Sequence, residues 1–287
     1  MKLWFRLYRS MFLLFIRKYW WKYVLLMGIM AVFLIILSST APVKSPSIFI
    51  IGITAYVFIA AFWIIFDIAL LTAMRFSDYK ALNNHGFSPE YLNYYYNKYI
   101  LNKPKVDYHY IIYAEGFMKI GDCKSAIATL NTLVIPESKA GLRTMYLYVY
   151  LMSALKMNDS ALADDIWRTN QAFLTRCMNN KKSDYNKFLY LAIIGADCAA
   201  GRYERALDTV NRYLSGELDR NYREIEINFT TLKVYILNKL ERFGEMDMTA
   251  NISLSLIAKK KPYLAYEWQE AVLHKDLEMA KNGILPI

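Results

Sequence analysis

The chain has 287 residues, of which 56% are hydrophobic and 21% are charged. An average globular protein has about 45–50% apolar and about 25% charged residues. The composition therefore excludes a disordered chain and is more apolar than that of an ordinary soluble domain. With only three cysteines, the chain is also not a disulfide-stapled secreted scaffold.

Residues 1–22 form a basic segment that contains six Lys and Arg residues and no acidic residue. On a helical projection its cations and its large apolar side chains lie on different sides, which is typical of a helix lying at a membrane surface. We predict a basic amphipathic interfacial helix here; an unstructured basic leader is the alternative. The membrane-surface cations would be Lys2, Arg6, Arg9, Arg17, Lys18 and Lys22.

Two long apolar runs follow. Residues 23–39 contain no charge, and residues 48–74 contain Asp67 as their only charge before Arg75. A bilayer core of about 30 Å requires about 20 helical residues, so both runs are predicted to be transmembrane helices joined by a short Pro-containing turn. The alternatives are two buried core helices of a soluble protein and, for the first run, a cleaved signal peptide.

The distribution of basic residues predicts the orientation. Six cations precede the first run, and only Lys44 lies between the two runs. Because cytoplasmic flanks are rich in Lys and Arg, the N-terminus and everything after residue 75 are expected in the cytoplasm. The hairpin topology favours an integral protein of a bacterial plasma membrane. The net charge of +10 is mostly this orientation signal, so we expect membrane lipid and no nucleic acid among the partners.

Asp67 is the one acidic residue within the predicted spans. An intramembrane carboxylate is costly and often functional. The simpler interpretation is that it pairs with a nearby cation or lies shallow enough to meet water, and both interpretations stay open.

Residues 75–104 are predicted to be a Tyr-rich helical connector. The second span should continue to His85 and end at Gly86, a residue suited to a left-handed helix terminus. A new helix should then begin at Ser88-Pro89, because Ser is a good N-cap and Pro is favoured at the first helical position.

Residues 105–261 have helical periodicity that is broken roughly every forty residues. The predicted turns are Gly121-Asp122, Asn158-Asp159, Gly201-Arg202 and Glu241-Arg242. Five residues after the first member of each turn stand Ala126, Ala163, Ala206 and Met246. Repetition at this period indicates stacked helical hairpins.

The segment 113–130, with Gly121 at its turn and Ala126 early in its second helix, resembles a tetratricopeptide repeat (TPR). Residues 199–210 are similar to the same turn, residues 155–167 fit in part, and residues 240–246 depart most because Met246 replaces the small residue. The predicted fold is therefore all-α: a transmembrane hairpin followed by a TPR-like α-solenoid of about four helical pairs. Residues 262–287 are predicted to be a C-terminal capping helix.

The resemblance implies that the first helix of each pair lines a groove. The candidate partner-binding residues are Glu115, Lys119, Tyr148, Met152, Lys156, Tyr235, Asn238 and Lys239. Their mixed basic and aromatic character predicts a protein partner, specifically an acidic peptide or helix. The alternative is that lysines lie near helix C-termini only because the helix dipole favours them there.

The three histidines are isolated, and no metal-binding, phosphate-binding or nucleophile motif occurs. We therefore expect no metal, no cofactor and no catalytic residues. The preferred hypothesis is a membrane-anchored cytoplasmic scaffold that binds a protein through its solenoid groove. The alternative is an accessory or regulatory subunit of a membrane transport, secretion or envelope-synthesis complex, contacted through the transmembrane helices; a lipid-facing enzyme is the third possibility. The oligomeric state stays open.

Overall fold

A computed structural model describes residues 8, 12, 28, 32, 46–178, 186–216, 226–261, 264, 266 and 268–286. Apart from Tyr8 and Phe12, the predicted interfacial helix lies outside the described residues, as do its six cations and, apart from Gly28 and Val32, the first predicted span. The chain divides into two units, residues 1–84 and residues 85–287.

The described part of the first unit is the helix α2 (Pro46–His85), which contains the second predicted span. It ends where the sequence predicts, and Gly86 has the left-handed φ of 61° that a helix terminus requires. Among the described residues, no helix combines the length and the apolarity that crossing a membrane demands. Asp67 is half-buried on α2.

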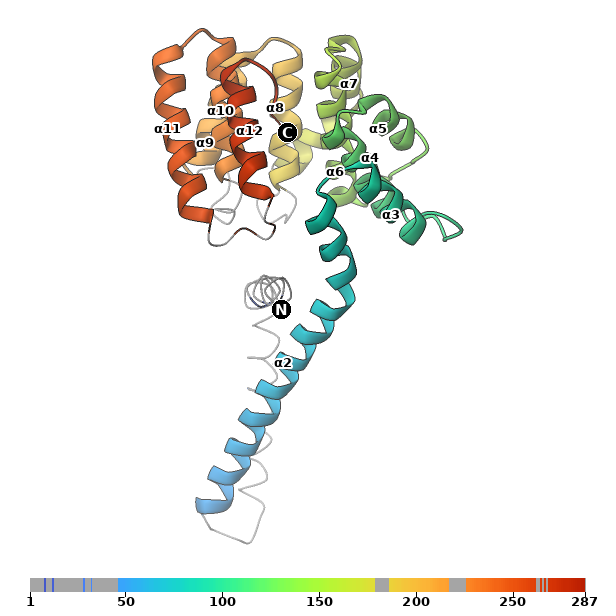
Figure 1. Ribbon diagram of the computed structural model, residues 1–287, viewed down its shortest axis with the longest axis vertical. Coiled ribbons are helices and arrows are strands. Elements are labelled where there is room, and N and C mark those ends of the chain that lie inside the picture. The colour runs from blue at the N-terminus through green and yellow to red at the C-terminus, as the bar shows by residue number, and fades with distance from the viewer. Residues whose placement is uncertain are drawn as a thin grey trace. The chain divides into compact units, whose positions relative to one another are not determined.

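The described part of the second unit contains ten helices. In chain order they are α3 (Pro89–Tyr99), α4 (Asp107–Ile120), α5 (Cys123–Leu130), α6 (Ala140–Lys156), α7 (Ser160–Met178), α8 (Asn186–Ala199), α9 (Tyr203–Leu214), α10 (Glu226–Lys239), α11 (Phe243–Lys260) and α12 (Gln269–Lys281). They pack mostly against their sequential neighbours, which makes this an all-helical domain (Figure 1). Ser88 caps α3 by accepting a hydrogen bond from the Tyr91 backbone N–H at 3.3 Å, as the Ser-Pro pair predicts.

Four helix pairs among these elements share one kind of turn. The pairs are α4–α5, α6–α7, α8–α9 and α10–α11. Each first helix is followed by a residue with positive φ, and these residues are Gly121, Asn158, Gly201 and Glu241. In each turn the next backbone N–H reaches back five residues to a carbonyl oxygen, at 2.8–3.0 Å. This is the Schellman arrangement, which satisfies the free carbonyls at a helix end.

The small residues that follow these turns are buried where the paired helices approach. Ala126 and Ala206 are fully buried, Ala163 is almost so, and the larger Met246 is also buried. A small side chain near the turn lets two antiparallel helices come close together. The turns and their alanines therefore lie where the periodicity predicts.

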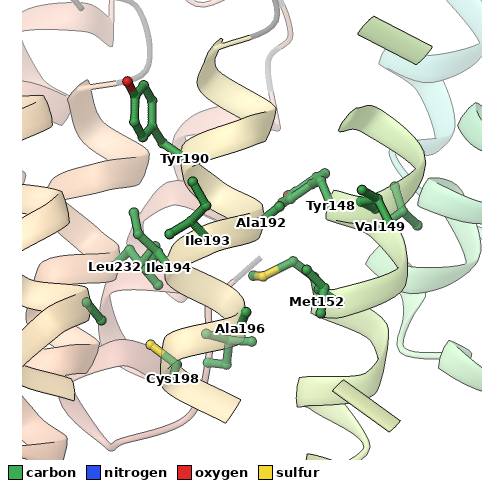
Figure 2. Close-up of a cluster of buried hydrophobic side chains, with 14 of the residues drawn as sticks. Tyr148, Val149, Met152, Tyr190, Ala192, Ile193, Ile194, Ala196, Cys198 and Leu232 are labelled. Carbon is green, nitrogen blue, oxygen red and sulfur yellow. The ribbon is translucent and has the colours of Figure 1, made fainter. Parts of the chain in front are cut away.

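The core of this unit continues between neighbouring pairs. Figure 2 shows Tyr148 and Met152 of α6 pointing toward Ala192 and Ala196 of α8, while Val149 lies on the other side of α6. A Cβ atom added at Gly195 would lie 3.1 Å from the Met152 sulfur. The absence of a side chain at residue 195 therefore sets the close approach of α8 to α6.

Candidate functional site

The second unit contains a small cleft of about 50 Å³, which we call the central cleft. Its walls come from four helices and from the residues after α12. They are formed by Tyr148 and Met152 of α6, Leu191 of α8, Asn228, Thr231 and Leu232 of α10, Leu273 and Asp276 of α12, and Pro286. Three of these helices, α6, α8 and α10, are the first members of their pairs.

Of the eight predicted groove residues, Tyr148 and Met152 line the central cleft. Both side chains are almost fully buried, so they form the floor of the cleft and have little exposed surface of their own. Burial raises the pKa of the Tyr148 phenol, and the nearby carboxylates of Glu115 and Asp276 add to the effect. Tyr148 is therefore neutral at physiological pH.

The three predicted lysines are engaged in local contacts. Lys119 lies 3.5 Å from Glu115 on the same helix and 4.5 Å from the centre of the Phe87 ring. The Lys156 ammonium donates to the Met118 carbonyl at 3.2 Å, which joins α6 to α4.

Lys239 is exposed and lies 5.6 Å from the centre of the buried Tyr235 ring. Asn238 donates its side-chain N–H to the Lys281 carbonyl at 2.7 Å. The Asn238 hydrogen bond connects α10 with the C-terminal end of α12. Tyr235, Asn238 and Lys239 do not line the central cleft, so the structure divides the predicted groove residues among several local contacts.

Lys156 has an unusual electrostatic environment. Burial lowers its pKa, while the Cys123 thiol and the Asp276 carboxylate oppose that shift. Asp276 belongs to α12, so its charge acts on a residue of another helix, α6. Sequence reasoning missed Asp276 because its position on a terminal helix does not reveal which face of the stack it approaches.

Another charged cluster holds the α8–α9 turn. The fully buried Asp197 carboxylate lies 2.9 Å from the Arg202 Nε and 3.1 Å from the Arg205 Nε. Burial raises the pKa of Asp197, and the two arginines partly oppose that shift. Its two cations come from the start of the next helix, so the cluster fixes the turn. Sequence reasoning did not identify this cluster.

No metal centre is seen in the described part of the chain, where no group of three His, Cys, Asp or Glu side chains could hold an ion. His109 stacks on the Tyr99 ring at 4.4 Å, and its Nδ1 lies 2.9 Å from the Tyr95 hydroxyl. Burial raises the pKa of the thiols of Cys123, Cys177 and Cys198, which disfavours their reactive thiolate forms.

Comparisons with known proteins give no family: no family model, curated protein or solved structure matches the chain. The function must therefore be argued from the helices and the central cleft alone.

Proposed function

We propose that the chain is a membrane-anchored scaffold whose TPR-like helical stack binds a segment of another protein at the central cleft. The observation that carries the proposal is the contrast between an α2 helix with exposed large apolar side chains and a helical domain with four similar pairs. The first feature supports insertion into an apolar environment, and the second supports a shaped docking surface.

The exposed residues of α2 support the membrane part of the proposal. Phe58, Phe62, Trp63 and Met74 each expose more than half of their side-chain surface. Such a large exposed apolar surface calls for lipid or a partner to cover it. Together with the basic N-terminal residues, it favours an integral protein of a bacterial plasma membrane, with both the N-terminus and the helical domain in the cytoplasm.

The four helix pairs support the docking part. Stacked helical hairpins bury a continuous core and expose an extended concave face, which such proteins use for binding. In the proposed mechanism the anchor raises the local concentration of the bound partner at the membrane. It requires no bond chemistry, no metal and no cofactor.

A second candidate function is an accessory or regulatory subunit of a membrane transport, secretion or envelope-synthesis complex. It is favoured by the aromatic cluster on α2, where the Phe62 and Phe66 rings lie 6.3 Å apart and Trp63 meets Phe66 edge-on at 6.1 Å. Exposed aromatic side chains are common anchors of protein contacts. In this case α2, with Asp67, would contact the other membrane protein.

Affinity purification of the full chain in mild detergent separates the two functions. Asn228→Trp would fill the central cleft from an exposed position on α10, and Asn251→Trp places the same bulk at an exposed position on α11 as a control. The scaffold function predicts that the partner is lost with Asn228→Trp and retained with Asn251→Trp and Phe62→Ser. The subunit function predicts loss with Phe62→Ser alone.

A partner retained by all three variants would contradict both functions. The membrane part is tested independently by washing membranes with alkaline carbonate and by adding protease to intact cells. We expect the chain to stay in the membrane pellet and its helical domain to be protected in intact cells. Release into the supernatant, or cleavage of the domain from outside, would overturn the proposed anchorage and orientation.

A further inference from the structure

The C-terminal segment, residues 268–286, contacts widely separated parts of the helical domain. At its start, the Trp268 ring lies edge-on to the Phe87 ring at 5.9 Å, and a Cβ at Gly86 would be 3.9 Å from Trp268. At its end, the Lys281 carbonyl accepts the hydrogen bond from Asn238. A Cβ at Gly283 would lie only 2.6 Å from the Asn238 oxygen.

The middle of the segment forms one wall of the central cleft. Leu273 and Asp276 of α12 line it opposite Tyr148 and Met152 of α6. Figure 1 shows α12 in dark red in front of α10, with the last residues turning back toward α8. The helix α12 packs on both helices of the last pair, α10 and α11.

The side chains of the segment have the pattern of a docked amphipathic helix. Leu277 and Ala280 are almost fully buried, and Leu285 is buried beyond the end of α12. Glu278 points outward: most of its side chain is exposed, and its carboxylate lies 3.7 Å from the Lys281 ammonium on the same helix. One face is therefore bound to the stack and the other is solvated, as in helix-in-groove recognition.

The segment also carries an acidic residue that acts on a lysine of α6. Asp276 stands at the central cleft, and its carboxylate acts on the half-buried Lys156 ammonium of α6. A carboxylate at this position favours the charged form of a lysine that burial disfavours. Asp276 thus favours the charged form of Lys156, while the nearby Lys275 and Lys119 ammonium groups oppose it.

We propose that the C-terminal segment occupies, within the same chain, the surface that the partner takes. The inference rests on the proposed scaffold function and names its partner class and its regulation. The partner is an amphipathic helix that repeats the pattern of Leu273, Asp276 and Leu277: two leucine-like residues four apart with an acidic residue between them. Because the segment already covers the surface, the partner must displace it. The apparent affinity for the partner is therefore lower when fewer molecules have the segment released.

The test is a fluorescence anisotropy titration of the full chain in detergent micelles with a labelled synthetic peptide of residues 268–286. Asp276→Lys in the chain places a like charge beside Lys156 and should release the segment. The unaltered peptide is then expected to bind this variant at least tenfold more tightly than it binds the wild-type chain. Glu278→Lys makes the same charge reversal on the outer face and should leave the affinity within twofold.

A double variant tests whether the charges of residues 156 and 276 hold the segment in place. Lys156→Glu combined with Asp276→Lys restores opposite charges, so this chain should close again and bind the peptide as weakly as wild type. Equal peptide affinities for the wild type and the folded Asp276→Lys variant would overturn the inference. Concentration-dependent dimers of Asp276→Lys with exchanged segments would also overturn it, in favour of a second copy as the occupant.

A second measurement applies if Asp276→Lys does not fold. Hydrogen exchange of the wild-type chain should be at least tenfold faster in α12 than in α10 and α11, because a displaceable segment opens without them. Equal exchange in the three helices would make α12 an integral part of the core and contradict the inference. Failure of the scaffold function alone would give a different result from failure of this inference. In that case the Asp276→Lys chain would still bind the peptide but would retain no cellular partner.

Discussion

The helix α2 and the helical domain use the same large apolar residues in opposite ways. Phe62 on α2 exposes 66% of its surface, whereas Phe229 on α10 is completely buried and stacks on Tyr213 at 3.8 Å. In the domain, each helix covers its apolar face with a neighbouring helix. The described part of α2 leaves much of its apolar surface uncovered, so its stabilising contacts must come from outside that helix.

This difference teaches that apolar content alone does not define a core. Eight of the domain's helices are paired through defined turns, so burial follows from their connectivity. Along α2 apolar residues occur all around the helix, and among its described side chains only the face with Ile68, Thr72 and Tyr79 is buried. Variants can therefore be chosen that affect the domain strongly and α2 hardly at all, or the reverse.

The largest expected effect comes from removing a domain aromatic. Phe229→Ala should lower the free energy of unfolding of the full chain by about 3–5 kcal/mol, because it leaves a cavity beside Tyr213. Phe62→Ala should change it by less than about 0.5 kcal/mol, because that ring is exposed. Urea unfolding followed by circular dichroism in detergent checks both; equal losses would show that α2 is as integral to the folded core as α10.

A smaller loss should follow from a change at a turn of the domain. Gly201 has φ of 69°, so Gly201→Ala forces a Cβ into the left-handed region and should cost about 1–2 kcal/mol. Gly244 lies inside α11 with no atom near its Cβ position, so Gly244→Ala should stabilise by about 0.5–1 kcal/mol. The same unfolding measurement compares them. If Gly201→Ala and Gly244→Ala changed the free energy of unfolding in the same direction, the turn conformation would not control domain stability.

Alkaline pH should weaken the domain through its buried tyrosines. Burial raises the pKa of Tyr146 to about 12 and that of Tyr148 further, so the unfolded chain releases these protons first as the pH rises above 10. The native state binds more protons in this window, so stability is present below pH 10 and falls above it.

Tyr148→Phe removes one of these protons and should flatten that fall by about 1.4 kcal/mol per pH unit at most. Unfolding midpoints of the variant and the wild type measured between pH 9 and pH 11 give the slope. Parallel curves would contradict the buried, neutral state of this phenol. Tyr150→Phe should flatten the fall less, because that ring is less buried and its hydrogen bond to Asn131, at 2.6 Å, opposes the rise that burial causes in its pKa.

The smallest expected effect is a gain at the fourth turn. Glu241 has φ of 57°, a conformation that is strained for a side chain with a Cβ. Glu241→Gly should therefore stabilise the chain by about 0.5–1 kcal/mol, less than the full relief of strain because glycine also loosens the unfolded chain. Asn158→Gly should gain less, since Asn tolerates this region better. A thermal unfolding scan that shows a loss for Glu241→Gly would contradict the strain.

Much of the helical domain could be predicted from the sequence because its signals are local. Gly86, the Ser88-Pro89 pair and the four turn residues each act within one helix end, so they mark boundaries without knowledge of the rest of the fold. The start of the last helix was harder. The structure begins α12 at Gln269, whose side chain accepts the Tyr266 backbone N–H at 3.1 Å, and not at Pro262.

The central cleft depended on signals that are not local. The amphipathic pattern of α12 indicates that one face is buried but not which surface buries it. Lys156 and Asn238 were placed on the groove side, yet their partners, the Met118 and Lys281 carbonyls, are backbone atoms 38 and 43 residues away. No residue pattern records such a contact. Asp197 was missed for the opposite reason, because an acid within an apolar helix resembles an ordinary surface residue until its burial is known.

The packing of Trp268 against Phe87 has a consequence for synthesis. These residues are separated by about 180 positions, so the contact that joins the two ends of the domain forms only after almost the whole chain has left the ribosome. At about 5–20 residues per second, the early helices wait roughly 10–40 s for it. During that interval Trp268 does not yet cover Phe87 and the aromatic side chains around it. We therefore expect the nascent chain to be most prone to aggregation at its first helices.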